Sequence, residues 1–439
     1  MVQPAAAPSS AKSIRLFFHA PGIAAHRPRP SLPMISGAQA TTADTIRGLY
    51  PNHMLTGNRG NIIHAEAPAK IFAKSPSESA YGNLAEILNV VGKDFAARMS
   101  RSFDLIIISM ANFIRPDHDG TRLLESLKAL EDRVPVVVLG CGLQGNHKLS
   151  DMMPGNAALI EWFNQNAVIF GVRGAKTANW LHDNGFKNAD VLGCPSLYAY
   201  PHSIMALDGA RARAKGAAAE VMTAGYLKIA GGTVVLRGAE LARAFRKIRA
   251  SYVFQDELWS FEPLLQAQGL YNEGNNELQA DVLNSWLGQQ VEGKLAFKRY
   301  YYFNEAGAWR QAALRHHVYI GDRFHGGVAA LQAGVPAIFL SHDNRVAELT
   351  EHFDLPHLTT KTFIRKGLPA VLEEYLAPER IQAMKALYHR RSREFFAATA
   401  RAGLTPAIQN VPVPEMAQPA ALKAVPLRQK LRRLAHSFR

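Results

Sequence analysis

The sequence predicts an α/β protein built from two doubly wound domains. Short apolar runs rich in β-branched residues alternate with helix-like stretches between residues 104 and 340. Continuous apolar strands separated by helices are typical of parallel sheets that are covered on both faces. The chain has 439 residues, 48% of them hydrophobic, which suits roughly two domains of ~150–200 residues each.

The expected strands fall into two groups, separated by an Ala-rich helical stretch in which the strand pattern fades. They lie at residues 104–109, 134–139, 167–170 and 191–192, and then at 252–254, 318–320 and 337–340. We therefore predict an N-terminal Rossmann-like domain over residues 44–205 and a C-terminal one over 231–402. Residues 206–230 are expected to form a helical connection.

The net charge of +14 is concentrated at the two ends of the chain. Residues 1–43 hold four basic residues and no acidic one, and residues 416–439 hold six basic residues and no acidic one. Removing these ten charges leaves +4 on the rest of the chain. A nucleic-acid-binding core is not expected, because counterion release needs basic residues gathered on one folded face.

Both ends are expected to lie outside the domains. Residues 1–43 are rich in Ala, Pro and Ser, which predicts a disordered arm; they lack the continuous apolar segment of a secretory signal. Residues 403–439 begin as a Pro-rich linker and end in a basic segment with helical apolar spacing: Leu427, Leu431, Leu434 and Phe438. Such a segment could form a helix that lies on an anionic membrane surface or docks on its own domain, or it could be frayed. All three interpretations stay open.

The cysteine content and the hydropathy limit the class of protein further. Cys141 and Cys194 are the two cysteines, which excludes a disulfide framework and a Cys-rich zinc site. We expect both to be buried near strand ends. No apolar run approaches the ~18–20 residues that span a bilayer. The expected location is the cytoplasm, with peripheral contact to the inner face of the plasma membrane through the C-terminal segment.

Candidate site residues follow the predicted strands, because doubly wound sheets bind ligands beyond the carboxyl ends of their strands. The strongest candidate is the segment Gly321–Gly327, in which Arg323 and His325 precede a helix that opens at Gly326. An arginine fork suits a carboxylate or phosphate. A histidine can give or take a proton near neutral pH, and a helix N-terminus attracts anions.

Three weaker candidates lie at other strand ends or glycine turns. Arg173 lies between two glycines after the strand at 167–170. Near the N-terminus, Gly57, Asn58 and Gly60 form a glycine loop that could approach a substrate closely. At the end of the strand at 337–340, His342 and Arg345 follow Ser341.

The sequence gives no sign of metal or hydrolase chemistry. The histidines of the C-terminal half do not form H-E-x-x-H or pair with a CxxC motif, and no G-x-S-x-G elbow occurs. No metal and no cofactor are predicted, and no role is predicted for the adjacent His316 and His317. An anionic donor handled by acid–base chemistry suits the residues that remain.

The motifs together resemble the polysaccharide pyruvyl transferase family. The C-terminal signature spans Gly321–Gly326, Ala330–Pro336 and His342–Leu349. The central segment, Val172–Thr177 with Asn188 and Gly193–Ser196, and the loop Gly57–Gly60 resemble the same family in the same order. The resemblance covers roughly residues 55–360.

The resemblance implies two facing domains like those of B-type glycosyltransferases. It also implies transfer of pyruvate from phosphoenolpyruvate to hydroxyls of a polysaccharide or lipid-linked glycan, with a pyruvate ketal as product. By the match, Arg323, Arg173 and Gly326 would bind the donor, and His325 would act as general acid or base. Asn61 stands where the family commonly has Asp, and an amide cannot serve as a carboxylate base.

The sequence leaves two other functions open. A nucleotide-sugar glycosyltransferase or epimerase could use the same architecture, and it would need contacts to a base and a ribose. A non-catalytic glycan-assembly protein could also keep the fold, although a binding protein has little need for an acid–base residue. The leading hypothesis is a metal-independent transferase that acts on a bacterial surface or exported polysaccharide.

Overall fold

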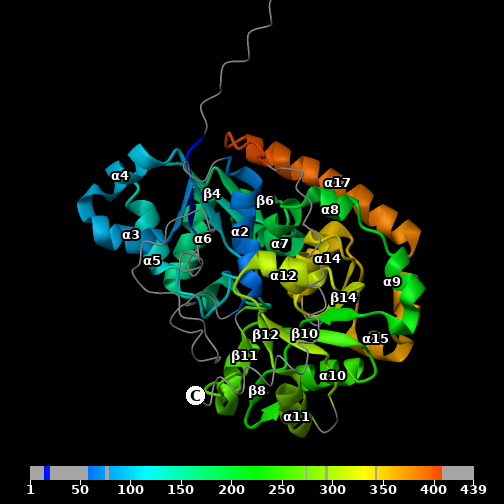
Figure 1. Cartoon of the computed structure of the whole chain (residues 1–439). Helices are drawn as coiled ribbons and strands as arrows, with labels where there is room; N and C mark the ends of the chain where they lie inside the picture. The colour runs from blue at the N-terminus through cyan, green and yellow to red at the C-terminus, as the bar shows by residue number, and fades with distance from the viewer. Residues whose placement is uncertain are drawn as a thin grey trace, which may run out of the picture.

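The chain folds into two α/β lobes, shown one above the other in Figure 1. The computed structural model describes residues 14–19, 58–74, 79–272, 274–291, 295–341 and 344–407. The upper lobe carries β4 and β6, and the lower lobe carries β10 and β12. None of the described helices is long and apolar enough to cross a membrane.

The N-terminal lobe contains a six-stranded sheet in the order β2-β1-β3-β4-β5-β6, with every neighbouring pair parallel. Its strands are β1 (Leu16–His19), β2 (Ser79–Gly82), β3 (Leu105–Ser109), β4 (Val136–Cys141), β5 (Ile169–Val172) and β6 (Ala189–Val191). Leu105–Ile108 are almost wholly buried, as expected for an apolar, β-branched strand with helices on both faces.

Helices alternate with these strands. They are α2 (Gly60–Phe72), α3 (Leu84–Val91), η2 (Gly92–Asp94), α4 (Phe95–Ser102), α5 (Thr121–Lys128), η3 (Leu149–Asp151), α6 (Pro154–Asn166), α7 (Ala175–Asp183), η4 (Pro195–Tyr198) and α8 (Pro201–Met205). The local sequence explains where some of these helices begin. Pro154 occupies the first turn of α6, where a backbone N–H would have no partner within the helix, so its absence in proline is tolerated. The Asn83 side chain accepts a hydrogen bond from Ala85 N at the start of α3.

The C-terminal lobe contains an eight-stranded sheet in the order β11-β12-β13-β10-β7-β14-β15-β16. The parallel strands are β7 (Val221–Thr223), β10 (Ala250–Phe254), β13 (Arg299–Tyr302), β14 (Val318–Gly321), β15 (Ala337–Leu340) and β16 (His357–Leu358). The antiparallel hairpins are β11 (Tyr271–Asn272) with β12 (Glu277–Leu278), and β8 (Ile229–Ala230) with β9 (Thr233–Val234). The strand order reverses between β7 and β14, which is where such sheets bind ligands.

Helices cover this second sheet as well. They are α9 (Ala210–Lys215), η5 (Gly216–Ala218), α10 (Leu236–Phe245), η6 (Glu257–Ser260), η7 (Glu262–Leu264), α11 (Ala280–Gln290), α12 (Ala306–Ala313), α13 (Phe324–Gln332), α14 (Asn344–Phe353), α15 (Thr360–Lys366), α16 (Leu368–Tyr375) and α17 (Pro378–Ala400). The predicted fold class, two doubly wound Rossmann-like domains facing a cleft, is confirmed.

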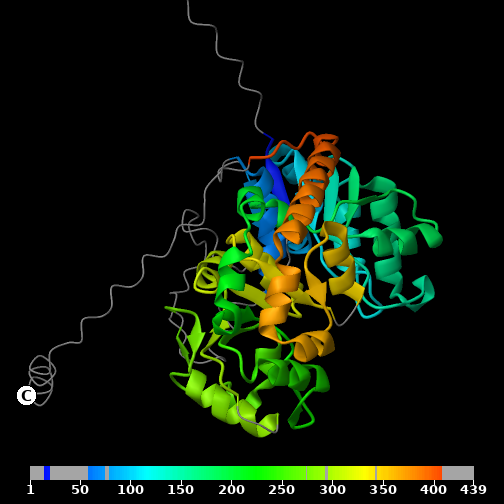
Figure 2. The same ribbon diagram turned by 90° about the vertical axis from the view of Figure 1, so that its right-hand side faces the viewer.

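The last helix, α17, joins the two lobes, and Figure 2 shows it in orange on the face turned toward the viewer. Near its start, Ile381 belongs to the core of the C-terminal lobe. Near its end, the Phe395 ring stacks on Tyr198 with 4.1 Å between centroids and also faces Phe72. The last helix of the predicted second domain, residues 231–402, therefore packs on the first lobe as well.

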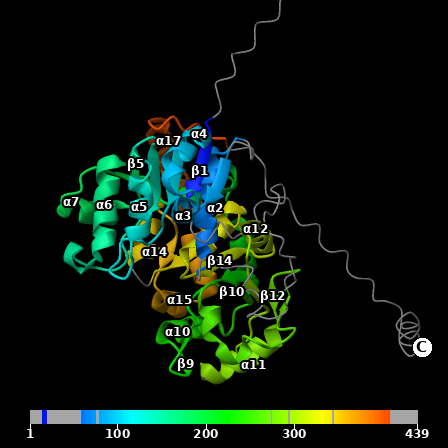
Figure 3. The same cartoon turned by 90° about the vertical axis from the view of Figure 1, so that its left-hand side faces the viewer.

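The prediction of a disordered arm over residues 1–43 is wrong for residues 16–19. These residues form β1, an interior strand of the first sheet, visible in dark blue in Figure 3. Arg15 beside it forms an ion pair with Asp104, with Nη2 and Oδ1 2.7 Å apart. A four-residue strand within a segment rich in Ala, Pro and Ser has little effect on the average composition, which explains the error.

Two other predicted boundaries are also corrected. The segment 206–230, predicted as a helical connection, contains β7, which pairs with β10 and β14 inside the second sheet. Residues 403–407, predicted as the start of a linker, lie against the N-terminal lobe: Leu404 is buried, and Ala407 N donates to Ile71 O at 2.6 Å. The basic segment near the C-terminus lies outside the described residues.

Candidate active site

A pocket between the two lobes collects the ends of strands from both sheets. Its empty space is about 560 Å³ with its open mouth included. Residues of the N-terminal lobe that line it are Asn58, Asn61, His64, Ala111, Asn112, Gly140, Arg173 and Cys194. Residues of the C-terminal lobe are Gln255, Asp322, Arg323, Phe324, His325, Val346 and Leu349.

Arg323 lies where the strand order of the second sheet reverses. Its Nε donates to the carbonyl of Gly225, in the segment after β7, at 2.7 Å. Its Nη2 donates to Asp256 Oδ1 at 2.6 Å and to Glu257 Oε2 at 2.9 Å. Among the residues that the structure describes, none accepts a hydrogen bond from Nη1, so that nitrogen is available to a ligand.

The guanidinium of Arg323 stays protonated in spite of its burial. Burial alone would lower the pKa of the guanidinium, but the carboxylates of Glu257 and Asp256 outweigh burial and raise it. The Tyr226 ring also lies under the guanidinium, with Cζ 4.8 Å from the ring centroid, a favourable cation–π arrangement. The side chain is thus a permanently charged, well-positioned anion-binding group.

Glu257 is a buried acid whose charge is linked to Arg323. Its side chain is wholly buried, and it accepts a 2.7 Å hydrogen bond from the Tyr252 hydroxyl. Burial raises the pKa of Glu257 to about 7, although Arg323 opposes the rise. Near neutral pH this carboxyl is therefore partly protonated, and Arg323 then carries more uncompensated positive charge toward the pocket.

Arg173 follows β5 on the opposite wall of the pocket. Its Nε donates to Glu348 Oε2 at 2.9 Å, Nη1 donates to Asn112, and Nη2 donates to the Leu143 carbonyl. Glu348 in turn accepts from the N–H of Thr177 at 2.6 Å and from its hydroxyl at 3.1 Å. Because a guanidinium has five N–H donors, these contacts orient Arg173 without using all of its donors.

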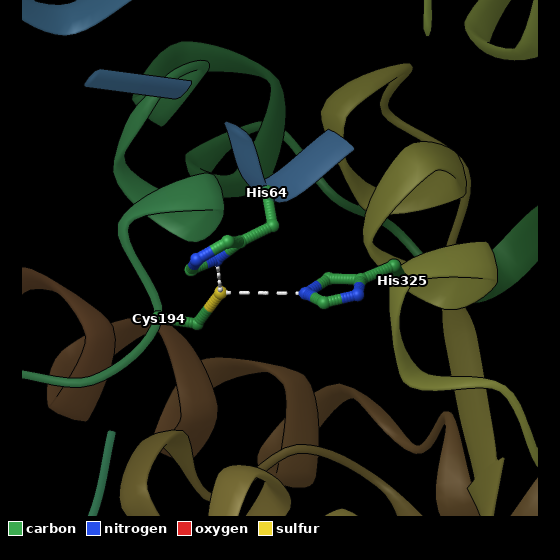
Figure 4. A group of neighbouring side chains, drawn as sticks. All are labelled: His64, Cys194 and His325. Atoms are coloured by element: carbon green, nitrogen blue, oxygen red, sulfur yellow. Dashed lines mark hydrogen bonds between the residues drawn. The ribbon is translucent and has the colours of Figure 1, made fainter. Parts of the chain in front are cut away.

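His325, in the first turn of α13, faces two residues of the other lobe. Figure 4 shows His64, Cys194 and His325 pointing toward one another. His325 Nε2 lies 3.6 Å from Cys194 Sγ, and His64 Nδ1 lies 3.4 Å from the same sulfur. Burial lowers the pKa of His64 to about 4 and raises the pKa of Cys194 to about 11, so both side chains are neutral when no ligand is bound.

The start of α2 brings the two lobes into very close contact. Gly60 N donates to Asn58 Oδ1 at 3.0 Å and to Gln255 Oε1, from the end of β10, at 3.2 Å. A Cβ atom at Gly60 would lie 2.6 Å from that Gln255 oxygen and 3.1 Å from His325 Cβ. A glycine is therefore needed here for close approach rather than for a turn.

The structure brings several of the predicted site residues into this one pocket: Arg173, Arg323, His325 and Asn58. Asn61, noted for its departure from the family, lines it too. Gly60 lies beside the pocket, at the contact between the lobes. Gly326 lies deeper in α13, where its N–H donates to Arg323 O at 3.1 Å and an added Cβ would meet the Tyr319 hydroxyl at 2.8 Å. Its observed role is close packing.

Three further predicted residues have no described position in the pocket. Gly57 and His342 lie outside the described residues, as does the side chain of Arg345. The histidine pair that the sequence left without a role lies away from the pocket. His316 Nδ1 contacts the Ala312 carbonyl, and His317 Nδ1 accepts from Glu220 N at 3.0 Å, beside β7.

Sequence reasoning missed several residues of this region, among them His64, Asn112, Gln255 and Glu257. Three of them follow predicted strands closely: Asn112 comes soon after β3, and Gln255 and Glu257 after β10. The same strand-end rule that selected Arg173 could have found these. His64 lies inside the first turns of α2, and no spacing in the sequence marks it.

Comparison with known proteins then decides the family. The family profile described as polysaccharide pyruvyl transferase matches residues 58–344, a span that includes Arg173, Arg323 and His325. The chain belongs to the polysaccharide pyruvyl transferase family. Membership indicates a transferase that acts on polysaccharide. No curated protein matches the sequence significantly.

Solved structures with similarity to this pyruvyl transferase family member are distant. Anabaena Alr3699/HepE, solved in complex with UDP and glucose, is 10% identical, with 89% of this chain and 97% of that chain covered and a TM-score of 0.42. The trehalose 6-phosphate synthase of Burkholderia multivorans is 12% identical, with 97% and 98% covered and a TM-score of 0.43. A putative UDP-N-acetylglucosamine 2-epimerase from Listeria monocytogenes is 14% identical, with 82% and 97% covered and a TM-score of 0.44.

Proposed function

We propose that the protein transfers pyruvate from phosphoenolpyruvate to two hydroxyls of a polysaccharide or lipid-linked glycan. The products are a cyclic pyruvate ketal and inorganic phosphate. The observation that carries the proposal is the placement of Arg173, Arg323 and His325 in one pocket, in a chain of this family. Two permanent cations and one proton-transfer group are what a dianionic enol donor requires.

In the proposed reaction, His325 delivers a proton to the vinyl carbon of phosphoenolpyruvate. The neighbouring carbon becomes oxocarbenium-like, and one sugar hydroxyl attacks it and loses its proton. The phosphate then leaves with the C–O bonding electrons, and the second hydroxyl attacks the same carbon and loses its proton. Two hydroxyl protons are released in total. One replaces the proton that His325 gave to the vinyl carbon, and the other leaves with the phosphate.

The donor is bound through its two anionic groups. Arg323 offers Nη1, and Arg173, held by Glu348, offers N–H donors on the facing wall. The N-terminus of α13, a nine-residue helix, adds positive potential beside them. Proton transfer and anion binding supply the chemistry that this reaction needs, so we propose a metal-independent transferase with no cofactor.

The acceptor is proposed to enter beside the glycine loop at the start of α2. Asn58 and Asn61 line that side of the pocket, and amides hydrogen-bond sugar hydroxyls well. The peripheral membrane contact proposed from residues 416–439 rests on their basic, leucine-spaced sequence. Deletion of that segment should move the protein out of the membrane fraction, and an unchanged fraction would refute the contact.

The reaction is tested by incubating purified protein with phosphoenolpyruvate labelled with ¹³C at its second carbon and a broad panel of glycans. We expect phosphate release that depends on the acceptor and a ketal carbon signal by NMR. Arg323→Lys and His325→Ala should each lose activity. Absence of both products over the whole panel would refute the proposal, whereas calorimetric binding of a nucleotide sugar but not phosphoenolpyruvate would favour a glycosyltransferase.

A further inference from the structure

Three side chains on the pocket wall form a group that the proposed reaction uses only in part. His64 comes from α2 and Cys194 from the segment after β6, both in the N-terminal lobe, whereas His325 comes from α13 in the C-terminal lobe. One ligand atom from each residue lies within 4.8 Å of the other two. His64 and Cys194 are buried, with 2% of each side chain exposed.

The two distances from the Cys194 sulfur to the histidine nitrogens match those between ligands of one tetrahedral cation. With Zn–S near 2.3 Å and Zn–N near 2.0–2.1 Å, a sulfur and a nitrogen on the same zinc ion lie about 3.6 Å apart. The two observed S···N distances are 3.4 and 3.6 Å. The rings of His64 and His325 are 5.6 Å apart between centroids and tilted rather than stacked, and Figure 4 shows a nitrogen of each ring directed at the sulfur.

Three polar groups converge on the sulfur of Cys194, and a neutral thiol would bind them only weakly. Cys194 Sγ lies 2.9 Å from the Ser196 hydroxyl as well as close to both imidazoles. A thiol donates one weak hydrogen bond, and its sulfur is a weak acceptor for the others. A cation among one sulfur and two nitrogens would satisfy all three ligands together.

We propose that His64, Cys194 and His325 bind one Zn²⁺ ion or a similar borderline-soft divalent cation. The three residues leave a fourth coordination position that faces the pocket, as in zinc sites with three protein ligands. The sulfur releases its proton to solvent when the cation binds. Because the ligands come from both lobes, the cation links the lobes across the pocket.

Cation binding has a consequence for activity, and this step rests on the proposed function. His325 Nε2 is the nitrogen that faces the sulfur, so a cation bound there removes His325 from proton transfer. Zinc is therefore an inhibitor of the transferase, acting on the proton-transfer group itself rather than on the arginines that bind the donor.

Binding is measured first, without reference to the reaction. Tag-free protein stripped of metal is titrated with Zn²⁺ against a chromophoric chelator, and Co²⁺ is substituted to detect a thiolate-to-cobalt charge-transfer band. We expect one tight site per chain. Cys194→Ser should remove the band and weaken Zn²⁺ affinity by more than about 100-fold, since even indirect partners of metal ligands contribute 10–100-fold.

The matched control is Cys141→Ser, because Cys141 is the other cysteine of the chain and lies buried in β4 outside this group. This variant should keep the band and the affinity. Circular dichroism should show that both variants are folded. The absence of a tight site in the wild type, or equal affinity in wild type and Cys194→Ser, would overturn the proposal.

Inhibition of the transferase by Zn²⁺ is then measured in a separate activity assay. Zn²⁺ should inhibit the wild type at one equivalent, and Cys194→Ser should need more than about 100-fold more Zn²⁺ for the same fractional loss of its own metal-free rate. Tight binding without inhibition would leave the metal site in place and refute the proton-transfer role of His325. Absence of pyruvyl transfer in every sample would refute the proposed function but not the binding result.

Discussion

Arg173 and Glu348 form a buried ion pair that joins the two lobes beside the pocket. Arg173 Nε and Glu348 Oε2 are 2.9 Å apart, and each side chain is 3% exposed. Arg173 follows β5 of the N-terminal lobe, whereas Glu348 lies on α14 of the C-terminal lobe. Both charges are almost wholly shielded from water, so each depends on the other for compensation.

Removal of Glu348 should therefore be costly. We expect Glu348→Ala to lower the free energy of unfolding by about 3–5 kcal/mol, because it leaves a buried arginine without its carboxylate. Urea denaturation measures the change. The control is Glu394→Ala, which breaks an exposed pair with Arg391 on α17 and should cost less than about 1 kcal/mol. Equal losses in the two variants would show that the interlobe pair is not a structural requirement.

His325 can be separated from donor binding by kinetics. Under the proposed function, His325→Asn should lower kcat by about 10²–10⁴-fold because the proton donor is lost. KM for phosphoenolpyruvate should change little, because Arg173 and Arg323 remain. His389→Asn, on an exposed face of α17, is the control and should match the wild type. A large rise in KM with normal kcat would instead assign His325 to binding.

The sequence predicts this architecture well because parallel strands have a strong local signature. The buried runs at β3, β4, β5, β14 and β15 all begin or end within two residues of the expected segments. The rule that ligands bind beyond strand ends then selects Arg173 and Arg323 correctly as pocket residues. A local sequence pattern is therefore enough to predict a pocket residue when that residue directly follows a recognisable strand.

Long-range contacts explain what the sequence does not predict. β1 and β7 are four and three residues long and lie in Ala-rich segments of the chain. The composition around them therefore hides their strand pattern, and the neighbouring strands of each sheet provide their pairing. His64 becomes part of the site because α2 packs against α13 and η4. The partners of Arg323, Asp256 and Glu257, are more than sixty residues away in sequence, and no spacing rule connects them.

Glu257 predicts a pH dependence of donor binding. The carboxyl is faced by the Tyr252 hydroxyl, Arg323 and the neighbouring Asp256, and its pKa is about 7. As pH rises through this value the carboxyl ionises and competes with the donor for Arg323. Under the proposed function, KM for phosphoenolpyruvate should rise about tenfold between about pH 6 and 8, and Glu257→Gln should remove the rise.

Two controls make this result specific. The donor phosphate titrates near pH 6 as well, so the variant and the wild type are compared at each pH. Stability gives a second measure: because the folded-state pKa lies above the ordinary value near 4.3, this group's contribution is fully present below about pH 4 and is lost as pH rises through about 7. A wild-type stability that instead increases relative to Glu257→Gln over this range would contradict the assignment.

The contact at Gly60 predicts that a single methyl group disturbs both stability and catalysis. In Gly60→Ala the new Cβ would overlap Gln255 Oε1, so the lobes must separate slightly and the Gly60–Gln255 hydrogen bond weakens. We expect a loss of about 1–3 kcal/mol in unfolding free energy. Under the proposed function we also expect about a 10–100-fold fall in kcat/KM, since catalysis is sensitive to small displacements.

The control is Gly307→Ala within α12, where an added Cβ meets nothing within 4 Å and alanine favours the helix. Gly60→Ala with the stability and activity of this control would show that the lobes tolerate separation at this contact.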